Sequence, residues 1–242
     1  MSSSPRSAAT ERSAGAAPVA LPNYGIDADR VLSTDGLVAA ARRRLAGRYA
    51  IDQFGGDPHL MDLVAWVPAA LIRVDVEGAE HLPRSGPALL VANRGFGVVE
   101  PLVLGLAIRR AAGRRLRVVG APEVPLLGPA ARKLGAVGYR PDDIAALLRA
   151  GHLAAAPLGM TWLRAGAGEA PRALVAATLG CPVVPVAVRP GGPFNLAIHP
   201  WRVVVGEPLL PPPDTPPDDQ LAAAELSEQV RDAVRGLLRD AS

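Results

Sequence analysis

The sequence predicts an α/β fold, a mostly parallel sheet with helices on both faces that is preceded by two N-terminal helices. Two observations carry this prediction. Apolar runs of strand length alternate with helix-length segments between residues 73 and 210, which is typical of a layered α/β domain. Runs such as 88–92 and 183–188 are apolar throughout, and strands without alternation are typical of a parallel sheet that is covered on both faces.

The apolar runs predict seven strands. The first is short and alternates polar with apolar residues, whereas most of the others are continuously apolar. They span 73–77, 88–92, 116–119, 137–139, 152–156, 183–188 and 201–206. Helical patterns fill most of the gaps, and Gly151 is a typical helix stop signal. These helices are predicted at 101–112, 124–134, 142–151 and 171–179.

Four parts are expected along the chain. They are a disordered leader, a helical lead-in, an α/β domain, and a Pro-rich linker with a C-terminal helix, at 1–22, 23–72, 73–210 and 211–242. The leader lacks the continuous apolar core of a secretory signal peptide. Asp218 or Asp219 is expected to cap the final helix, which would dock on the domain through an apolar stripe. The stripe consists of Leu226, Val230, Val234 and Leu237.

Two helices are predicted in the lead-in. Asp35 is a suitable cap for a helix at 36–48, and Asp57-Pro58 places proline in the first turn of a helix that ends near residue 71. The apolar segment 63–72 is too short to span a membrane. A place flat in a membrane interface and a place in an ordinary buried helix both remain open for it.

Composition excludes several classes of function. The net charge is only +3, and Lys133 is the only lysine, so the basic residues are almost all arginines. They are scattered along the sequence and few aromatic residues lie among them, which is not typical of a nucleic-acid-binding surface. Cys181 is the only cysteine, so no internal disulfide forms, a reducing compartment is allowed, and a buried inert thiol is expected. Because Cys and His nowhere have metal-ligand spacing, we expect no metal and no bound cofactor.

Six short segments carry a family resemblance. They read Tyr-x-x-Asp-x-Phe-Gly-x-Asp-Pro at 49–58, Val-Ala-Asn-Arg at 91–94, Gly-Ala-Val-Gly-Tyr-Arg at 135–140, Pro-Leu-Gly-Met-Thr at 157–161, Val-Pro-Val-Ala-Val at 184–188 and Val-Gly-Glu-Pro-Leu at 205–209. In this order they resemble blocks of the glycerolipid acyltransferase family, the 1-acylglycerol-3-phosphate acyltransferases and their relatives. The resemblance covers about residues 48–210.

The resemblance implies an acyltransferase-like domain at 73–210 that acts in phospholipid metabolism. The acceptor would be a lysophospholipid, with acyl-CoA or acyl carrier protein as co-substrate. The protein would be located in the cytoplasm and would bind peripherally to the inner face of the membrane. Carried over by position, the substrate-binding residues are Asn93, Arg94, Arg140, Gly159, Thr161 and Arg164.

The chain departs from the family at the residues that perform its chemistry. The family's His-x4-Asp pair removes the proton from the acceptor hydroxyl, and this chain has Arg94 and Val99 at those positions, with Glu100 one position out of register. An arginine cannot act as that base, because a guanidinium holds its proton throughout the working pH range. The Glu of the family's Pro-Glu-Gly-Thr segment is Leu158. No catalytic residue is therefore assigned, and these substitutions indicate a degenerate member.

Arg94 has two interpretations. Its guanidinium would clamp a phosphate or carboxylate together with Arg140, or it would pair with Glu100 in the space of the lost His–Asp pair. The chain's four histidines do not supply an obvious replacement base: His152 is predicted at the amino end of its strand, away from the active edge, and the others have no recognisable partner. The other three are His59, His81 and His199.

Three functional hypotheses follow. The first is an inactive or altered member that still binds an anionic lysolipid or an acyl thioester. The second is an active acyltransferase with a modified mechanism. The third is a nucleotide-binding or protein-interaction module, because 95–100 is a near miss for Gly-x-Gly-x-x-Gly between a strand and a helix.

Overall fold

The computed structural model describes the sheet and most of the helices around it. It describes residues 38, 42, 45–47, 51–57, 60–61, 72–93, 99–120, 125, 127–138, 140–158, 180–190, 200–211, 216 and 219–240. The predicted leader at 1–22 and the predicted helix at 171–179 lie outside this set. Of the predicted helix at 36–48, the described Val38, Arg42 and Leu45 are helical.

Six strands form one sheet in the described part of the chain. In sequence order they are β1 (Val74–Glu77), β2 (Ala88–Ala92), β3 (Leu116–Val118), β4 (Leu153–Pro157), β5 (Val183–Arg189) and β6 (Trp201–Val205). Their order in the sheet is β1-β6-β5-β2-β4-β3. All neighbours pair in parallel except β5 and β6, which are antiparallel. The prediction of a mostly parallel sheet is confirmed.

The predicted strand at 137–139 is wrong as a strand. Of its residues, 137 and 138 are described, and among these Val137 forms an isolated parallel bridge with Val119. Val137 accepts a hydrogen bond from the Gly120 N–H and donates one to the Val118 carbonyl, each at 2.9 Å. The pairing does not continue into a strand because a helix begins at Pro141. Proline in the first turn of a helix favours helical backbone.

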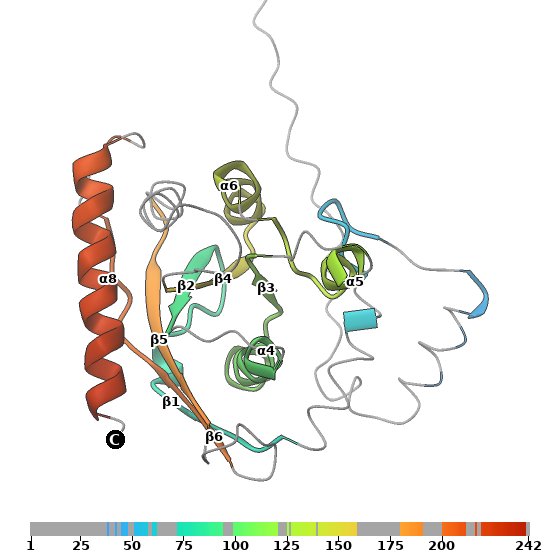
Figure 1. Cartoon of the computed structure of the whole chain (residues 1–242), viewed down its shortest axis with the longest axis horizontal. Helices are drawn as coiled ribbons and strands as arrows, with labels where there is room; N and C mark the ends of the chain where they lie inside the picture. The colour runs from blue at the N-terminus through green and yellow to red at the C-terminus, as the bar shows by residue number, and fades with distance from the viewer. Residues whose placement is uncertain are drawn as a thin grey trace, which may run out of the picture.

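Helices cover both faces of the sheet, as predicted (Figure 1). They are α4 (Val99–Ala112), α5 (Leu127–Lys133), α6 (Pro141–Arg149) and α8 (Gln220–Asp240), with a short 3₁₀ helix η1 (Ala79–His81). Helix α4 packs with β1, β3 and β6 on one face, while α6 packs on β4 and α8 on β5 on the other. Helix α4 begins two residues before its predicted start, because Pro101 is tolerated in the first turn of a helix.

Strand β2 shows how one sequence supplies two cores. Its five residues are all buried, and alternate side chains point to opposite faces. Leu90 packs with Val103, Leu104 and Ile108 of α4, together with other buried side chains. Leu89 and Val91 lie in a second cluster with side chains of α6 and α8. A continuously apolar strand is thus required because neither face of the sheet is left to solvent.

Helix α8 docks by the predicted stripe. Asp219 caps it, because its Oδ1 accepts hydrogen bonds from the Leu221 and Ala222 N–H groups at 2.9 and 3.0 Å. Leu226, Val230 and Val234 are at most 2% exposed. In the ranges that the structure describes, no helix has the length and apolar character needed to cross a membrane.

Candidate functional site

The carboxyl ends of β2 and β4 lie side by side. Ala92 and Pro157 are register partners at the ends of these parallel strands. The Leu158 N–H donates a 2.7 Å hydrogen bond to the Ala92 carbonyl, and the Asn93 N–H donates one of 3.2 Å to Val186 on β5. The segments that follow β2 and β4 therefore leave the sheet at one edge, where open parallel sheets bind ligands.

The side-chain amide of Asn93 is hydrogen-bonded to the neighbouring strand β5. Its Nδ2 donates to the Val188 carbonyl at 2.9 Å, and its Oδ1 accepts from the Val188 N–H at 2.6 Å. The side chain thus imitates one more residue of strand pairing between β2 and β5. An amide carries two N–H donors, and the contact with Val188 uses one of them.

Val99 and Glu100 form the first turn of α4, at the same edge. Val99 is partly buried and packs against the core between α4 and the sheet. Glu100 is half-buried. A carboxylate in a first helical turn is stabilised by the positive end of the helix dipole.

Arg140 immediately precedes α6 and has extended backbone, φ −83° and ψ 139°. Its carbonyl accepts hydrogen bonds from the Asp143 and Ile144 N–H groups at 3.1 and 3.2 Å, and its side chain is exposed. Since α6 runs back towards the amino end of β4, its own N-terminus lies at the carboxyl edge of the sheet. Arg140 therefore shares that edge with Asn93 and Leu158.

The remaining predicted ligands lie outside the described residues. They are Arg94, Gly159, Thr161 and Arg164. Leu158 is half-buried and packs against the core on the α6 and α8 face. In the ranges given above, no three His, Cys, Asp or Glu side chains are grouped as ligands of a metal ion.

Two histidines are described, and neither is a general base candidate by position. The His81 Nδ1 lies 3.0 Å from the Val205 carbonyl and holds η1 to the end of β6. His152 precedes the amino end of β4, as the sequence predicts, and contacts the ring of Phe54 edge-on with 5.5 Å between ring centroids. Burial lowers the pKa of His152, with a smaller contribution from the charge of Arg117.

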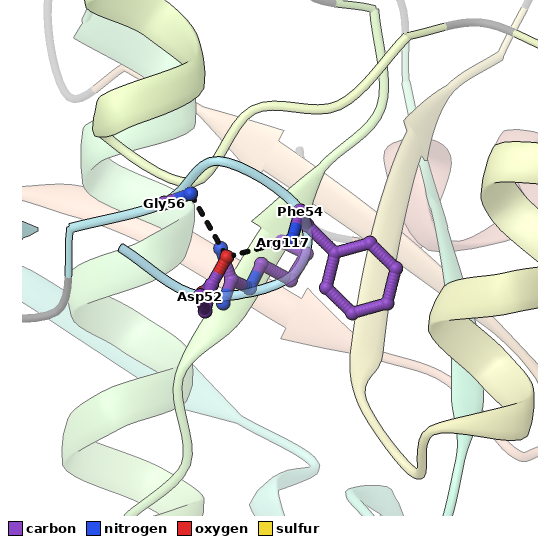
Figure 2. A network of polar contacts seen from close by, with 4 residues as sticks. All are labelled: Asp52, Phe54, Gly56 and Arg117. Carbon is purple, nitrogen blue, oxygen red and sulfur yellow. Dashed lines mark hydrogen bonds and ion pairs between the residues drawn. The ribbon is translucent and has the colours of Figure 1, made fainter. Parts of the chain in front are cut away.

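A polar cluster at the edge strand β3 was not predicted from the sequence. Asp52, Phe54 and Gly56 lie together around the guanidinium of Arg117 (Figure 2). Arg117 is 5% exposed although it lies in the middle of a strand. Two separate signals were available in the sequence. One is a single arginine within the apolar run 116–119, and the other is the distant motif at 49–58, to which the resemblance assigns no role.

Comparison with known proteins gives relatives whose function is not described. No family model matches the chain. The uncharacterised protein Rv0502 of Mycobacterium tuberculosis is 32% identical over 262 residues, covering 84% of this chain and 73% of the relative. An uncharacterised protein of Mycobacterium leprae is 32% identical over 253 residues, covering 81% of this chain and 69% of the relative.

Among solved structures, the chain is similar to the 1-acyl-sn-glycerophosphate acyltransferase PlsC of Thermotoga maritima. The TM-score is 0.48 and the sequence identity 17%, over 84% of this chain and 88% of that chain. The mycobacterial proteins have a higher sequence identity, 32%, over more than two thirds of their own length. The chain therefore belongs to the same family as these uncharacterised mycobacterial proteins.

Proposed function

We propose that this protein is an acyltransferase-like phospholipid-binding protein of the membrane surface. It binds an anionic lysolipid, an acyl thioester or both, and its acyl transfer is lost or altered. The observation that carries this proposal is the convergence of three separate motif segments at one edge of the sheet. Asn93 follows β2, Leu158 follows β4, and Arg140 precedes α6 at that same edge.

Arg140 is the anion ligand in this proposal. Its guanidinium is exposed and presents N–H donors in a geometry that matches a phosphate group. Arg94, adjacent in sequence to Asn93, is the second ligand that the family resemblance predicts.

The replaced residues argue for lost or altered chemistry. Val99 is partly buried against an apolar core and has no group that could orient a base. Arg94 cannot accept a proton near neutral pH. Loss of general-base catalysis alone typically lowers a rate by about 10²–10⁴-fold.

Exposed apolar side chains of the lead-in support contact with a membrane. Val38 is 50% and Leu45 89% exposed, and both are helical, as is the exposed Arg42. A helix with apolar and cationic side chains suits the boundary of an anionic membrane. The proposed location is accordingly the cytoplasm, at the inner face of the membrane.

Lipid binding tests the proposal. Titration of purified protein with a lysophosphatidate should give saturable binding, and Arg140→Ala should weaken it about 10- to 100-fold, as expected for lost charge-assisted hydrogen bonds. The matched control is Arg149→Ala, because Arg149 is exposed at the other end of α6. Equal affinity of Arg140→Ala and the wild type would contradict the assignment.

An active acyltransferase with a modified mechanism is the second candidate. Glu100 favours it, because a carboxylate remains in the first turn of α4 beside the family's aspartate position. Positioning of two substrates can by itself accelerate a reaction strongly. Thiol release from acyl-CoA with a panel of lysophospholipids, for wild type and Arg94→Ala, tests it beside a family member that retains His-x4-Asp. Faster turnover by the wild type than by Arg94→Ala supports an altered mechanism. No turnover by the wild type excludes acyl transfer to the lipids used.

A nucleotide-binding or protein-interaction module is the remaining alternative. Residues 95–98 of the near-miss glycine motif lie outside the described part of the chain. Nucleotide that co-purifies with the protein would favour this alternative over lipid binding.

A further inference from the structure

Asp52 uses its two carboxylate oxygens for two different tasks. Its Oδ1 accepts hydrogen bonds from the Phe54 and Gly56 N–H groups, both at 2.9 Å. Its Oδ2 forms an ion pair with Nη2 of Arg117 (Figure 2). The main chain of Asp52 also donates to the Gly56 carbonyl at 2.8 Å. One side chain thus closes the 52–56 loop and ties it to β3.

Arg117 is an unusual residue for its place. It is 5% exposed, and a guanidinium does not give up its charge on burial. Such a group requires a partner of opposite charge, which is Asp52. The Phe54 ring adds a cation–π contact, with 5.9 Å from its centroid to Cζ of Arg117. Nη1 has no hydrogen-bond partner within the described ranges.

Two glycines make room for this guanidinium. A Cβ on Gly56 would lie 2.9 Å from Oδ2 of Asp52 and closer still to Nη1 of Arg117. A Cβ on Gly135 would lie 3.4 Å from Nη1 and 2.9 Å from Cε of Met61. Gly135 also has φ +89°, which other residues rarely adopt. The guanidinium is therefore enclosed between the lead-in and the turn that follows α5.

That turn leads directly to Arg140. The Asp57 N–H donates to the Lys133 carbonyl at 2.9 Å, which joins the lead-in to the last turn of α5. Val137, two residues after Gly135, bridges to Val119 beside Arg117. Arg140 follows three residues later and precedes α6. The place of Arg140 thus depends on how the turn after α5 is held against β3.

We propose that Asp52 and Arg117 are positioning residues for the anion site. Their ion pair holds the 135–138 turn against the edge strand and thereby sets the place of the Arg140 guanidinium, which binds the phosphate of an anionic lysolipid. The last step rests on the function proposed above. This proposal assigns a function to the motif at 49–58: its residues Asp52 and Phe54 hold the lead-in against β3 through Arg117.

Hydrogen exchange tests the ion pair without any ligand. Asp52→Asn keeps the size and the Oδ1 acceptor but turns an amide donor towards the guanidinium. Exchange at 118–120 and 135–138 should rise on the order of 10-fold while β5 and β6 stay unchanged, as for a local opening. The matched control is Glu77→Gln, which breaks the exposed Glu77–Arg202 pair at the opposite edge of the sheet. Unchanged exchange at 135–138 in Asp52→Asn would overturn the proposal.

Lysophosphatidate binding tests the link to Arg140. Asp52→Asn should weaken binding about 10-fold, and Asp52→Asn/Arg140→Ala should bind no worse than Arg140→Ala alone, because both act through one guanidinium. Additive losses, or unchanged binding by Asp52→Asn, would overturn the link. No binding by the wild type would overturn the proposed function and this link with it, whereas the exchange result would still decide the ion pair.

A second variant covers the case in which Asp52→Asn does not fold. Arg117→Lys keeps the positive charge and loses the planar fork that pairs with the carboxylate. It should show the same rise in exchange at 135–138 and the same non-additive loss of lysophosphatidate affinity. Wild-type behaviour of Arg117→Lys in both measurements would overturn the proposal.

Discussion

Asn93 and Val188, 95 positions apart in the sequence, are joined by both ends of the asparagine amide. The Nδ2–O distance is 2.9 Å and the N–Oδ1 distance 2.6 Å. The last residue before 94–98 is therefore fastened to β5 as well as to the end of β2. Asn93 thereby ties the end of β2 to β5 immediately before Arg94.

Asn93→Ala should destabilise the fold. It leaves the N–H and the carbonyl of Val188 without their partner, which costs about 1–3 kcal/mol. Denaturant unfolding followed by circular dichroism measures the loss. Asn93→Asp is the informative companion, because it keeps the acceptor for the Val188 N–H and loses the donor to the carbonyl. An Asn93→Ala protein as stable as the wild type would show that this pairing contributes nothing.

Docking of α8 should depend on its buried stripe. Leu226 is 2% exposed, so Leu226→Ala should lower the free energy of unfolding by about 2–5 kcal/mol. Leu221 is 70% exposed on the same helix, and Leu221→Ala should change it by less than about 0.5 kcal/mol. Equal effects in thermal or denaturant unfolding would argue against docking by this face.

Stability should fall in mild acid because of His152. Burial, then the charge of Arg117, lowers the pKa of His152 below its ordinary value of 6.5, although Asp52 acts in the opposite direction. The unfolded chain then binds a proton that the folded chain does not. Stability is consequently lost as the pH falls from about 6.5 towards the folded pKa.

The variant His152→Gln isolates this contribution. Unfolding free energies measured at a series of pH values should show a smaller slope below pH ~6.5 for the variant than for the wild type. Parallel curves for the two proteins would assign the acid sensitivity to other groups.

Cys181 should react slowly with alkylating reagents in the folded protein. Burial raises the pKa of its thiol above the ordinary 9.0, and the thiolate is the reactive form. The rate of iodoacetamide modification, followed by mass spectrometry, should increase when the protein is unfolded in denaturant at the same pH. A folded rate equal to the unfolded rate would contradict this and would reopen Cys181 as a reactive group.

Several elements follow from the sequence alone because their signals are local. The strand at 88–92 has the predicted bounds, and Asp219 with the stripe of α8 is confirmed. A continuous apolar run, a capping residue and a four-residue spacing each report on a few neighbouring residues. The α/β class and the mostly parallel sheet follow from how such segments alternate.

Tertiary structure alone decided what joins distant segments. The antiparallel pairing of β6 with β5, the amide of Asn93 on Val188, and the ion pair of Asp52 with Arg117 link residues that local patterns treat separately. The predicted strand at 137–139 became a single bridge for the same reason, since pairing depends on a partner and not on apolar character. The local sequence around Arg117 does not indicate whether this arginine is buried. Its burial depends on the ion pair with the carboxylate of Asp52, which lies 65 positions away in the sequence.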